Sequence, residues 1–294
     1  MSAAYSTPSE DTSRAPNRFD LQGHRGARGL APENTIPAFR RALEIGVATL
    51  EMDVVVAGDG TVVVSHEPWM ASEKCVSPDG DRIADVDRHN IYEMAYDDVA
   101  TYDCGSQQLK NFPEQEPQAA RKPRLRDVIR MAEAYTRDHN RGPVFYNIEV
   151  KSRPEWDGTY HPKPRGFVER VLTAVTEAGV ASRTTIQSFD VRSLEHVHRL
   201  NAPVRTAFLV GWAANDGGAE NVEALSFLPD IYSPDVRLVD ENLVTTLRAR
   251  GVQLIPWTVN EIDAMKRLLR LGVDGFITDY PNRGRAVLDE YTAK

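Results

Sequence analysis

The residues best suited to chemistry are carboxylates and an imidazole set inside apolar runs. Glu51 and Asp53 interrupt the run TLEMDVVV, and His66 ends the run VVVSH that follows. Burying a charge is costly unless the charge is paired or binds a metal ion. Because the flanking residues are those of buried strands, we expect the three side chains to lie close together in one site, where a charged group or a metal ion balances them.

A hairpin accounts for their proximity. Residues 49–57 and 61–66 form two Val-rich arms, and the AGDG between them contains an Asp-Gly pair typical of tight hairpin turns. Side chains two residues apart project from the same face of a strand, so Glu51 and Asp53 point together. The returning arm brings His66 back toward their level.

Two further strand ends carry polar side chains. Asn147, Glu149 and Lys151 share one face of YNIEVKS, and His24 and Arg25 end the run LQGHR. Carboxylates with an amide oxygen suit one hard divalent cation, Mg²⁺ or Ca²⁺. The histidines suit acid–base chemistry near neutral pH, and the Arg and Lys suit phosphate oxygens. Taken singly, His24-Arg25 could be a structural pair and Glu149-Lys151 an ion pair; their combination favours a site.

Strands alternating with helices must position these residues. Helical patterns at 33–46, 124–139, 167–180, 241–251 and 262–272 separate the strands, and several end in a glycine: Gly46, Gly179, Gly251 and Gly272. Eight strands are predicted at 19–25, 49–57, 144–152, 184–189, 204–210, 230–236, 253–259 and 275–279. This alternation predicts an α/β fold, a (β/α)8 TIM barrel with polar strand ends at its active face. An open doubly wound sheet is the alternative, but no glycine-rich dinucleotide fingerprint accompanies it.

The chain divides into a tail and one barrel with an insertion. Residues 1–17 are polar and predicted to be disordered, and residues 18–291 form the barrel. Residues 68–122, rich in Pro, Asp, Gln and Lys, fit no strand–helix unit and predict a small inserted loop subdomain after the second barrel strand. A long loop at this face is usually functional, so we expect it to cover the mouth and select the substrate. Its cysteines, Cys75 and Cys104, are expected to be free thiols rather than a disulfide.

Composition limits the partners. Asp and Glu number 43 against 35 Lys and Arg, a net charge of −8, which argues against nucleic-acid binding but not against a small phosphorylated substrate. No apolar run approaches the roughly 20 residues of an integral membrane segment. The N-terminus has no apolar signal core, so the chain as written is expected in the cytoplasm, or in the periplasm or outside the cell if an export signal was removed.

Other polar features have simpler interpretations. The acidic segment 77–87 fails the spacing of a calcium loop and is predicted to be solvated. Five further histidines fall in predicted loops or polar helices and are expected at the surface: His89, His139, His161, His196 and His198.

Six segments together resemble the glycerophosphodiester phosphodiesterase family, in order and spacing, from residue 19 to 288: GHRGARGLAPENT, LEMDVVVAGDGTVVVSHEP, NIEVKS, QSF, PWTVN and GFITDYPN. The resemblance implies a β/α barrel that hydrolyses glycerophosphodiesters to glycerol 3-phosphate and an alcohol. It also implies roles by position: His24 and His66 as the acid/base pair, Glu51, Asp53 and Glu149 as metal ligands, Arg25 and Lys151 as phosphate contacts, and Trp257 as a pocket residue that by sequence alone fits the core equally well.

Some alternatives stay open. The family usually follows the second histidine with Asp, whereas this chain has Glu67, so the orientation of His66 is open. The resemblance allows attack either by the glycerol 2-hydroxyl, through a cyclic phosphate, or by water. A phospholipase D-type enzyme acting on sphingomyelin or lysophospholipids is an alternative and needs an apolar lip, for which Trp69, Met70 and Phe112 are candidates.

Two rivals fit less well. A binding module would not need two proton carriers. A sugar-processing barrel would need carboxylates on both sides of a glycosidic bond, and Glu51 and Asp53 lie too close together for that.

Overall fold

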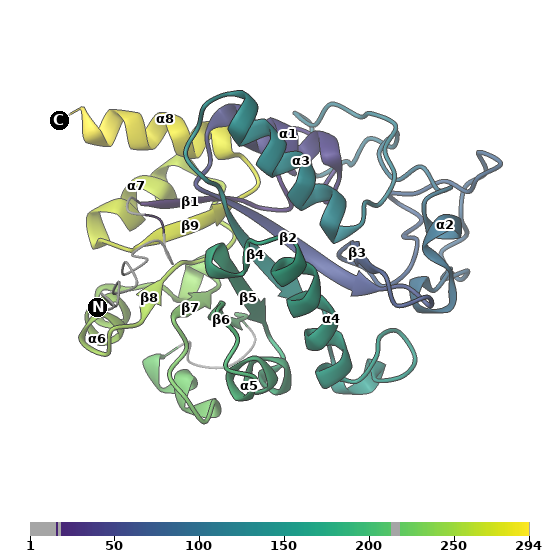
Figure 1. Ribbon diagram of the computed structural model, residues 1–294. Coiled ribbons are helices and arrows are strands. Elements are labelled where there is room, and N and C mark those ends of the chain that lie inside the picture. Colours follow the sequence, from purple (N-terminus) through teal and green to yellow (C-terminus); the bar gives the residue numbers. More distant parts are fainter. Residues whose placement is uncertain (1–15, 17–18, 213–217, 294) are drawn as a thin grey trace, which may run out of the picture.

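Eight parallel strands form a barrel in the computed structural model, which describes residues 16, 19–212 and 218–293 (Figure 1). Their order around the sheet is β8-β7-β6-β5-β4-β2-β1-β9. Backbone hydrogen bonds from Asp274 to Leu254 and from Ile277 to Pro256 join its two ends. The barrel strands are β1 (Asp20–Gly23), β2 (Thr49–Val56), β4 (Phe145–Val150), β5 (Thr184–Ser188), β6 (Arg205–Val210), β7 (Ile231–Pro234), β8 (Gln253–Leu254) and β9 (Gly275–Thr278). The predicted TIM barrel is confirmed, and the open doubly wound sheet is excluded.

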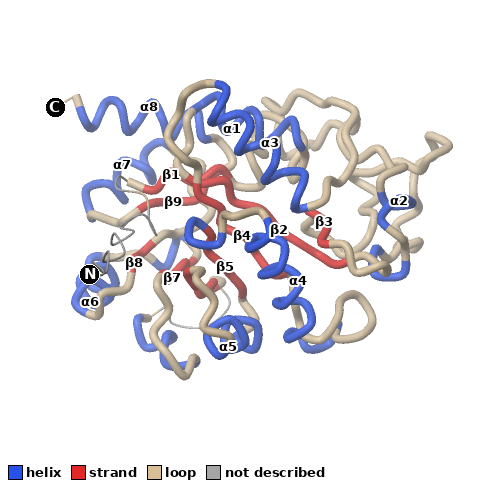
Figure 2. Tube along the Cα trace, in the orientation of Figure 1, coloured by secondary structure: helices blue, strands red, loops and turns tan. Residues whose placement is uncertain are grey.

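The helices surround the strands (Figure 2). They are α1 (Ile36–Ile45), α3 (Leu125–Asp138), α4 (Pro164–Glu177), α5 (Val191–Arg199), α6 (Glu241–Ala249), α7 (Ile262–Leu271) and α8 (Pro281–Thr292). Helix α1 illustrates why these sequences are helical: Thr35 caps its first turn, and Gly46, at φ 95°, closes its last. Its inward stripe, which includes Phe39 and Leu43, is buried against the sheet. Five of the helices were predicted; α5 and α8 were not named.

The hairpin sets the register of the polar strand ends. Strand β3 (Val62–Val64) returns antiparallel to β2, and Val54 pairs with Val64. On its other side β2 pairs with β4, which places Glu51 opposite Asn147 and Asp53 opposite Glu149. Since directly paired residues face the same side of a sheet, this register brings the carboxylates together.

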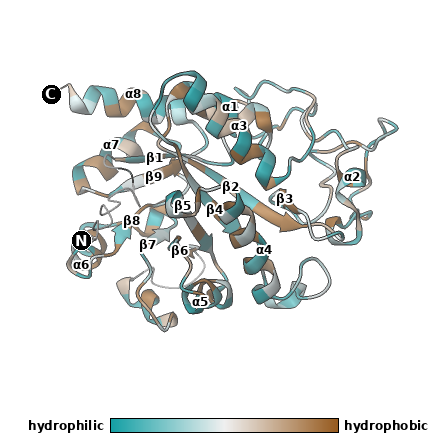
Figure 3. Ribbon diagram, viewed as in Figure 1, coloured by the Kyte–Doolittle hydropathy of each residue, from teal (hydrophilic) through white to brown (hydrophobic). Residues whose placement is uncertain are grey.

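Residues 68–122 form a subdomain beyond β3, at the end of the molecule opposite α8 (Figure 1). It contains the short helices η1 (Ile91–Glu93) and α2 (Tyr96–Val99). Side chains from the insertion and from the outer face of the β2–β3 hairpin make a separate apolar cluster: Val55, Ala57, Val63, Met70, Cys75, Ile83, Ile91, Tyr96, Val99 and Cys104. In Figure 3 the barrel helices carry both brown and teal residues, as amphipathic helices do, while the insertion is mixed along its loops.

The two cysteines of the insertion form a disulfide, so the expectation of free thiols is wrong. The reason is local folding: Val76 pairs with both Arg82 and Asp103 in antiparallel bridges, which brings Cys75 and Cys104 side by side in the apolar cluster. Sequence spacing of 29 residues gave no sign of this pairing.

Two other surface expectations are corrected. His161 is fully buried, because its ring packs on Trp156 and Phe167 while its Nε2 accepts the backbone N–H of Arg153. His139 and His198 are exposed, and His89 and His196 partly so. The segment 77–87 is exposed apart from the half-buried Ser77 and the buried Ile83. Met70 and Phe112 are buried, so the apolar lip expected from the insertion is not formed by them.

The sequence also predicts a disordered N-terminal tail and no membrane-spanning segment. The tail expected at residues 1–17 lies outside the described residues, apart from Pro16, so the domain boundaries stay predictions. Among the described helices, none has the length and apolarity required to cross a bilayer.

Candidate active site

Three carboxylates meet at the carboxyl ends of β2 and β4. Glu51, Asp53 and Glu149 each offer an oxygen, and these oxygens all lie within 4.8 Å of one another. All three side chains are buried. The β2–β4 register produces this cluster, as the spacing of the acidic residues in the two strands predicts.

The carboxylates are electrostatically unequal. Burial, followed by the charge of Asp53, raises the pKa of Glu51 well above its ordinary value, and burial raises that of Glu149 to about 7. Burial would also raise the pKa of Asp53, but Arg25 and Lys151 help to hold it well below its ordinary value. A cation among the three would relieve this cost, because it favours the ionised form of every carboxyl group.

The hydrogen bonds of the cluster leave room for an ion. Glu51 accepts the backbone N–H of Arg25 at 2.8 Å and the Gln187 side chain at 2.7 Å. Asp53 Oδ2 accepts from Asn34 at 2.8 Å, whereas the buried Oδ1 of Asp53 has no hydrogen-bond partner in the part of the chain that the structure describes. Clustered carboxylate oxygens fit a hard divalent cation such as Mg²⁺ or Ca²⁺.

Two cations border the carboxylates. Arg25 Nε lies 3.1 Å from Asp53 Oδ2, and its Nη1 lies 2.9 Å from Glu33 Oε1. Lys151 Nζ lies 2.7 Å from Glu149 and 3.8 Å from Asp53. Arg25 has φ 51°, a left-handed conformation that costs energy for a residue with a side chain and is typical of functional sites. The phosphate contacts predicted from sequence therefore lie beside the predicted metal ligands.

His24 is held by the barrel. Its Nδ1 lies 2.6 Å from Oδ1 of Asp279, which follows β9, and Asn260 donates to the other carboxylate oxygen at 2.8 Å. Burial lowers the pKa of His24 although Asp279 opposes this effect. Because an ionised carboxylate can only accept, Nδ1 carries the proton and Nε2 keeps its lone pair.

His66 is also hydrogen-bonded to a carboxylate, but both residues lie on the loop after β3. Its Nδ1 lies 2.7 Å from Oε1 of Glu67, whose own carboxylate lies 2.8 Å from Lys74 Nζ. Burial, reinforced by the charges of Arg25 and Lys151, lowers the pKa of His66 to about 4. The imidazole is therefore neutral in the free protein, and its Nε2 is free to accept a proton.

Both histidines lie near the acidic cluster, because the protonated form of either one would interact favourably with the Asp53 carboxylate. The structure thus brings seven of the eight predicted site residues together, with the other six around Asp53. The eighth, Trp257, lies after β8 on the inner apolar cluster and donates its Nε1–H to Ser233 at 2.9 Å. Its ring packs edge-to-face on Phe189, 5.5 Å away.

An aromatic rim occupies this part of the mouth. Phe189 is 44% exposed and Trp212 is 52% exposed, after β5 and β6 respectively. A Cβ at Gly211 would lie 3.8 Å from the Phe189 ring, and the Arg237 guanidinium covers Trp212 at 4.6 Å. Phe189 and Trp212 are therefore exposed aromatic side chains that follow β5 and β6, whereas Met70 and Phe112, two of the three residues expected to form an apolar lip, are buried.

Sequence reasoning missed several supporting residues. Gln187 and Asp279 lie at strand ends in QSF and GFITDYPN, so the rule that found Glu149 would have found them too. Asn34 and Glu33 lie in the segment PENT, after β1. Lys74 lies in the loop-like insertion, where no periodicity marks it.

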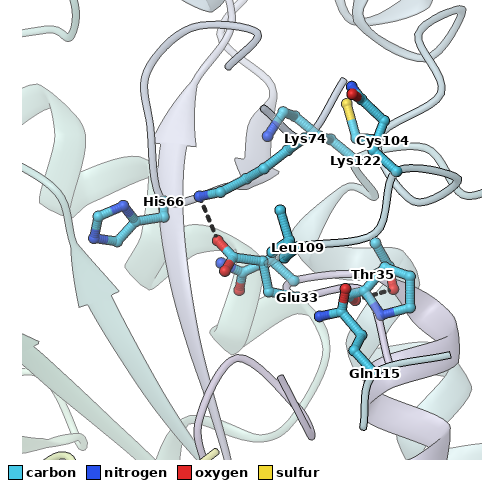
Figure 4. Close-up of a pocket in the computed structure, with 11 residues that line it drawn as sticks. Glu33, Thr35, His66, Lys74, Cys104, Leu109, Gln115 and Lys122 are labelled. Atoms are coloured by element: carbon cyan, nitrogen blue, oxygen red, sulfur yellow. Dashed lines mark hydrogen bonds and ion pairs between the residues drawn. The ribbon is translucent and has the colours of Figure 1, made fainter. Parts of the chain in front are cut away.

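The insertion closes one side of the site. A groove of about 690 Å³ lies between it and the barrel, and polar side chains line much of it, including Arg25, His66, Ser72, Lys110 and Asn111. A smaller cavity lies deeper, among Glu33, His66, Lys74, Gln115 and Lys122 (Figure 4). The groove gives a solvent path to His66.

Comparison with known proteins agrees with this geometry. Residues 24–283 match the model of the glycerophosphoryl diester phosphodiesterase family. A glycerophosphodiester phosphodiesterase of Caldanaerobacter subterraneus subsp. tengcongensis is 28% identical over 260 residues, 88% of this chain and 93% of that protein. A protein of Silicibacter pomeroyi DSS-3 assigned to the glycerophosphoryl diester phosphodiesterases superposes with a TM-score of 0.83 at 28% identity, over 95% of each chain. A phosphodiesterase of Oleispira antarctica, solved with sn-glycerol-3-phosphate, shares the fold at 20% identity, with a TM-score of 0.71 over 92% of this chain and 96% of the other.

Proposed function

We propose that this chain, which belongs to the glycerophosphoryl diester phosphodiesterase family and is a phosphoric diester hydrolase, cleaves glycerophosphodiesters to glycerol 3-phosphate and an alcohol. The proposed mechanism is histidine acid–base catalysis assisted by a metal ion. The observation that carries this proposal is the buried cluster of Glu51, Asp53 and Glu149, flanked by two neutral histidines and two cations at one end of the barrel.

The three carboxylates would hold one divalent cation. Their oxygens lie within 4.8 Å of one another, and Oδ1 of Asp53, which accepts no hydrogen bond from the described residues, is available as a ligand atom. When bound, the ion supplies Lewis-acid polarisation of a phosphate oxygen. Mg²⁺ and Ca²⁺ both match this donor set, which consists of oxygen alone.

Arg25 and Lys151 bind the remaining phosphate charge. Each already contacts a carboxylate of the cluster, so an oxygen placed between them would lie within reach of both. Their charges stabilise the pentavalent transition state, in which negative charge builds on those oxygens. Since both cations are fixed by acidic partners before substrate arrives, little reorganisation is needed.

The two histidines move protons in one displacement. One imidazole Nε2 takes the proton of the attacking hydroxyl as its oxygen bonds to phosphorus. The other, protonated when the anionic substrate binds, gives its proton to the leaving alkoxide as the phosphorus–oxygen bond breaks. The same pair serves attack by the glycerol 2-hydroxyl, with a cyclic phosphate that water opens in a second displacement, and direct attack by water.

Release of glycerol 3-phosphate from glycerophosphocholine, glycerophosphoethanolamine and glycerophosphoglycerol, with and without chelator, tests the proposal. We expect release that stops after chelation and returns with Mg²⁺ or Ca²⁺. Release of an alcohol phosphate instead would contradict it, because the opposite ester bond would then be the one cleaved. Release of free phosphate would contradict it as well, because both ester bonds would then be cleaved.

The insertion is proposed to select the alcohol. It follows His66 directly and, with Arg25 and His66, lines the groove of about 690 Å³. Asn111→Leu combined with Lys110→Met should change the ranking of head groups by kcat/KM while a small p-nitrophenyl diester is still hydrolysed. An unchanged ranking in this folded variant would assign the groove no role in specificity.

A second candidate substrate is a lysophospholipid, which would make the protein a phospholipase D-type enzyme on the same barrel. The exposed rings of Trp212 and of Phe189, which packs on Trp257, favour it, because large exposed aromatic side chains suit an acyl chain. Trp212→Ala should lower kcat/KM for lysophosphatidylcholine and leave glycerophosphocholine unaffected. Equal effects on both substrates, or no turnover of the lipid, would exclude this candidate.

A further inference from the structure

We propose that Lys74, in the insertion, is a positioning residue that fixes the orientation of His66 through Glu67. The inference rests on the proposed role of His66 as a proton carrier and adds the device that holds it. It assigns the insertion a part in catalysis besides its part in selecting the alcohol.

The contacts form a chain from the insertion to the imidazole. Lys74 Nζ donates to both oxygens of Glu67, at 2.8 Å each, and Glu67 Oε1 lies 2.7 Å from His66 Nδ1. The same ammonium donates to Glu33 Oε1 at 2.8 Å, which in turn accepts from Arg25 at 2.9 Å. One buried ammonium therefore joins the loop of His66 to the strand end of Arg25.

Glu67 needs such a partner. Compared with the Asp that the resemblance leads one to expect after the second histidine, Glu adds one methylene and one rotatable bond. A free side chain of this length would lose orientational order, and with it the hydrogen bond that sets the tautomer of His66. Lys74 removes this freedom, because it holds both carboxylate oxygens while His66 holds one.

The backbone of the same turn is held from the other end of the insertion. Lys122 Nζ donates to Ser65 Oγ at 2.8 Å, and Ser65 Oγ donates to the carbonyl of Glu67 at 2.6 Å. Figure 4 shows Lys74 and Lys122 extending into one cavity beside His66, with Glu33 facing them. Residues 65–67 are thus fixed by two lysines that the insertion supplies.

Lys74 itself is anchored independently of the site. Its backbone N–H donates to Ala71 at 3.0 Å, and the next residue, Cys75, is joined to Cys104 by the disulfide. Cys75 also lies in the apolar cluster of the insertion. The ammonium is therefore presented from a folded unit, rather than from a free loop that would have to order when substrate binds.

The test compares Lys74→Met, which keeps much of the side-chain length but removes the charge, with Lys74→Arg and with Lys266→Met. Lys266 pairs with Glu290 at 2.8 Å on the outer surface and serves as a matched control for loss of a Lys–Glu pair. We expect Lys74→Met to lower kcat on glycerophosphocholine about 10–100-fold, the range found for outer partners of metal-binding histidines, with little change in KM. Lys74→Arg should recover most of the loss, and Lys266→Met should show none.

Repeating Lys74→Met in two variants that already lack the contacts to His66 shows whether Lys74 positions His66 or only stabilises the fold. In Glu67→Gln and in His66→Asn, adding Lys74→Met should cost no further activity, because the chain of contacts is already broken. A loss that persists in both backgrounds, or that appears mainly in KM, would overturn the proposal and point to Glu33 and Arg25 instead. Loss of folded protein for Lys74→Met, with Lys74→Arg no better, would likewise assign Lys74 a structural role. If His66→Asn alone stays fully active, the proposed function has failed rather than this inference.

Discussion

The two histidines have equivalent carboxylate partners but are held by different parts of the molecule. His24 follows β1 and bonds Asp279, which follows the neighbouring β9 and is held by Asn260. His66 bonds the adjacent Glu67 on a loop, and that carboxylate is held by Lys74 of the insertion. The imidazole–carboxylate distances are 2.6 and 2.7 Å, so the local chemistry is nearly the same.

This difference separates what is fixed from what can vary. We call each histidine with the residues that hold it an arm. The His24 arm, which consists of His24, Asp279 and Asn260, lies on paired barrel strands over the main core, so a change there disturbs the sheet. The His66 arm rests on a subdomain with its own apolar cluster, which can change without repacking the barrel. The side chain of His66 is also 31% exposed against 11% for His24, and it lines the groove. A change in the insertion is therefore expected to alter specificity more readily than the reaction itself.

The largest expected effect concerns the acidic cluster, which lies between the two arms and serves both. Exhaustive chelation should abolish turnover of glycerophosphocholine, and added Mg²⁺ or Ca²⁺ should restore it. Glu51→Gln should raise the metal concentration needed for half-maximal activity about 10–100-fold, since it removes a charged ligand. Titration of activity with each metal measures this. Full activity after chelation, or an unchanged metal requirement in Glu51→Gln, would rule out a shared metal site.

The next effect compares the arms directly. His24→Asn and His66→Asn should each lower kcat on glycerophosphocholine by about 10²–10⁴, the range of general acid–base catalysis. The double variant should lose less than the product of the two, because the pair acts in one step. His198→Asn, which replaces an exposed imidazole stacked on Phe227, is the control.

An activated leaving group assigns the roles. A p-nitrophenyl diester needs little protonation, so it should rescue the variant that lacks the general acid and not the one that lacks the general base. Losses under tenfold in both histidine variants, with fold and metal binding intact, would refute the acid–base assignment.

Much of this site follows from strand periodicity. Glu51, Asp53 and Glu149 were placed together from the side-chain alternation of two strands, and the register of β2 with β4 confirms it. His24, Arg25 and Lys151 followed from the rule that barrel chemistry lies at carboxyl strand ends. The barrel itself followed from the strand–helix alternation, because each helix must bury an apolar stripe against the sheet.

The insertion could not be derived in this way. Its contacts depend on loop conformations without a period, so neither Lys74, nor Lys122, nor the disulfide was foreseen. His161 was misplaced for the same reason: an irregular turn packs its ring between aromatic side chains, where sequence polarity suggested solvent. Exposed apolar side chains were expected in the insertion, whereas the exposed rings of Phe189 and Trp212 follow β5 and β6.

A third effect tests whether the arms are independent. Asp279→Asn and Glu67→Gln should each lower kcat about 10–100-fold, because an amide can no longer enforce the Nδ1–H tautomer. Adding Lys74→Met should multiply the loss in Asp279→Asn and leave Glu67→Gln unchanged, since Lys74 holds the carboxylate of Glu67, whereas Asn260 holds that of Asp279. Steady-state kinetics of the four variants measure this. Equal further losses in both backgrounds would mean that the insertion supports the whole site.

The smallest expected effect comes from the disulfide, because it acts on the His66 arm only through the fold of the insertion. Cys75→Ser combined with Cys104→Ser should destabilise the insertion by about 3–4 kcal/mol in the chain-entropy account of a loop of this length. Hydrogen exchange should then accelerate between residues 68 and 122 and stay slow in the barrel strands. The loss of kcat should be smaller than in Lys74→Met, since the ammonium still returns to Glu67 whenever the insertion is folded. A reductant should reproduce this in the native protein and have no effect on the double variant. The contrary outcome is that hydrogen exchange accelerates but activity stays unchanged, even at a temperature where the insertion unfolds. The contact from Lys74 to Glu67 would then contribute nothing to catalysis, and the two arms would differ in structure but not in their contribution to the reaction.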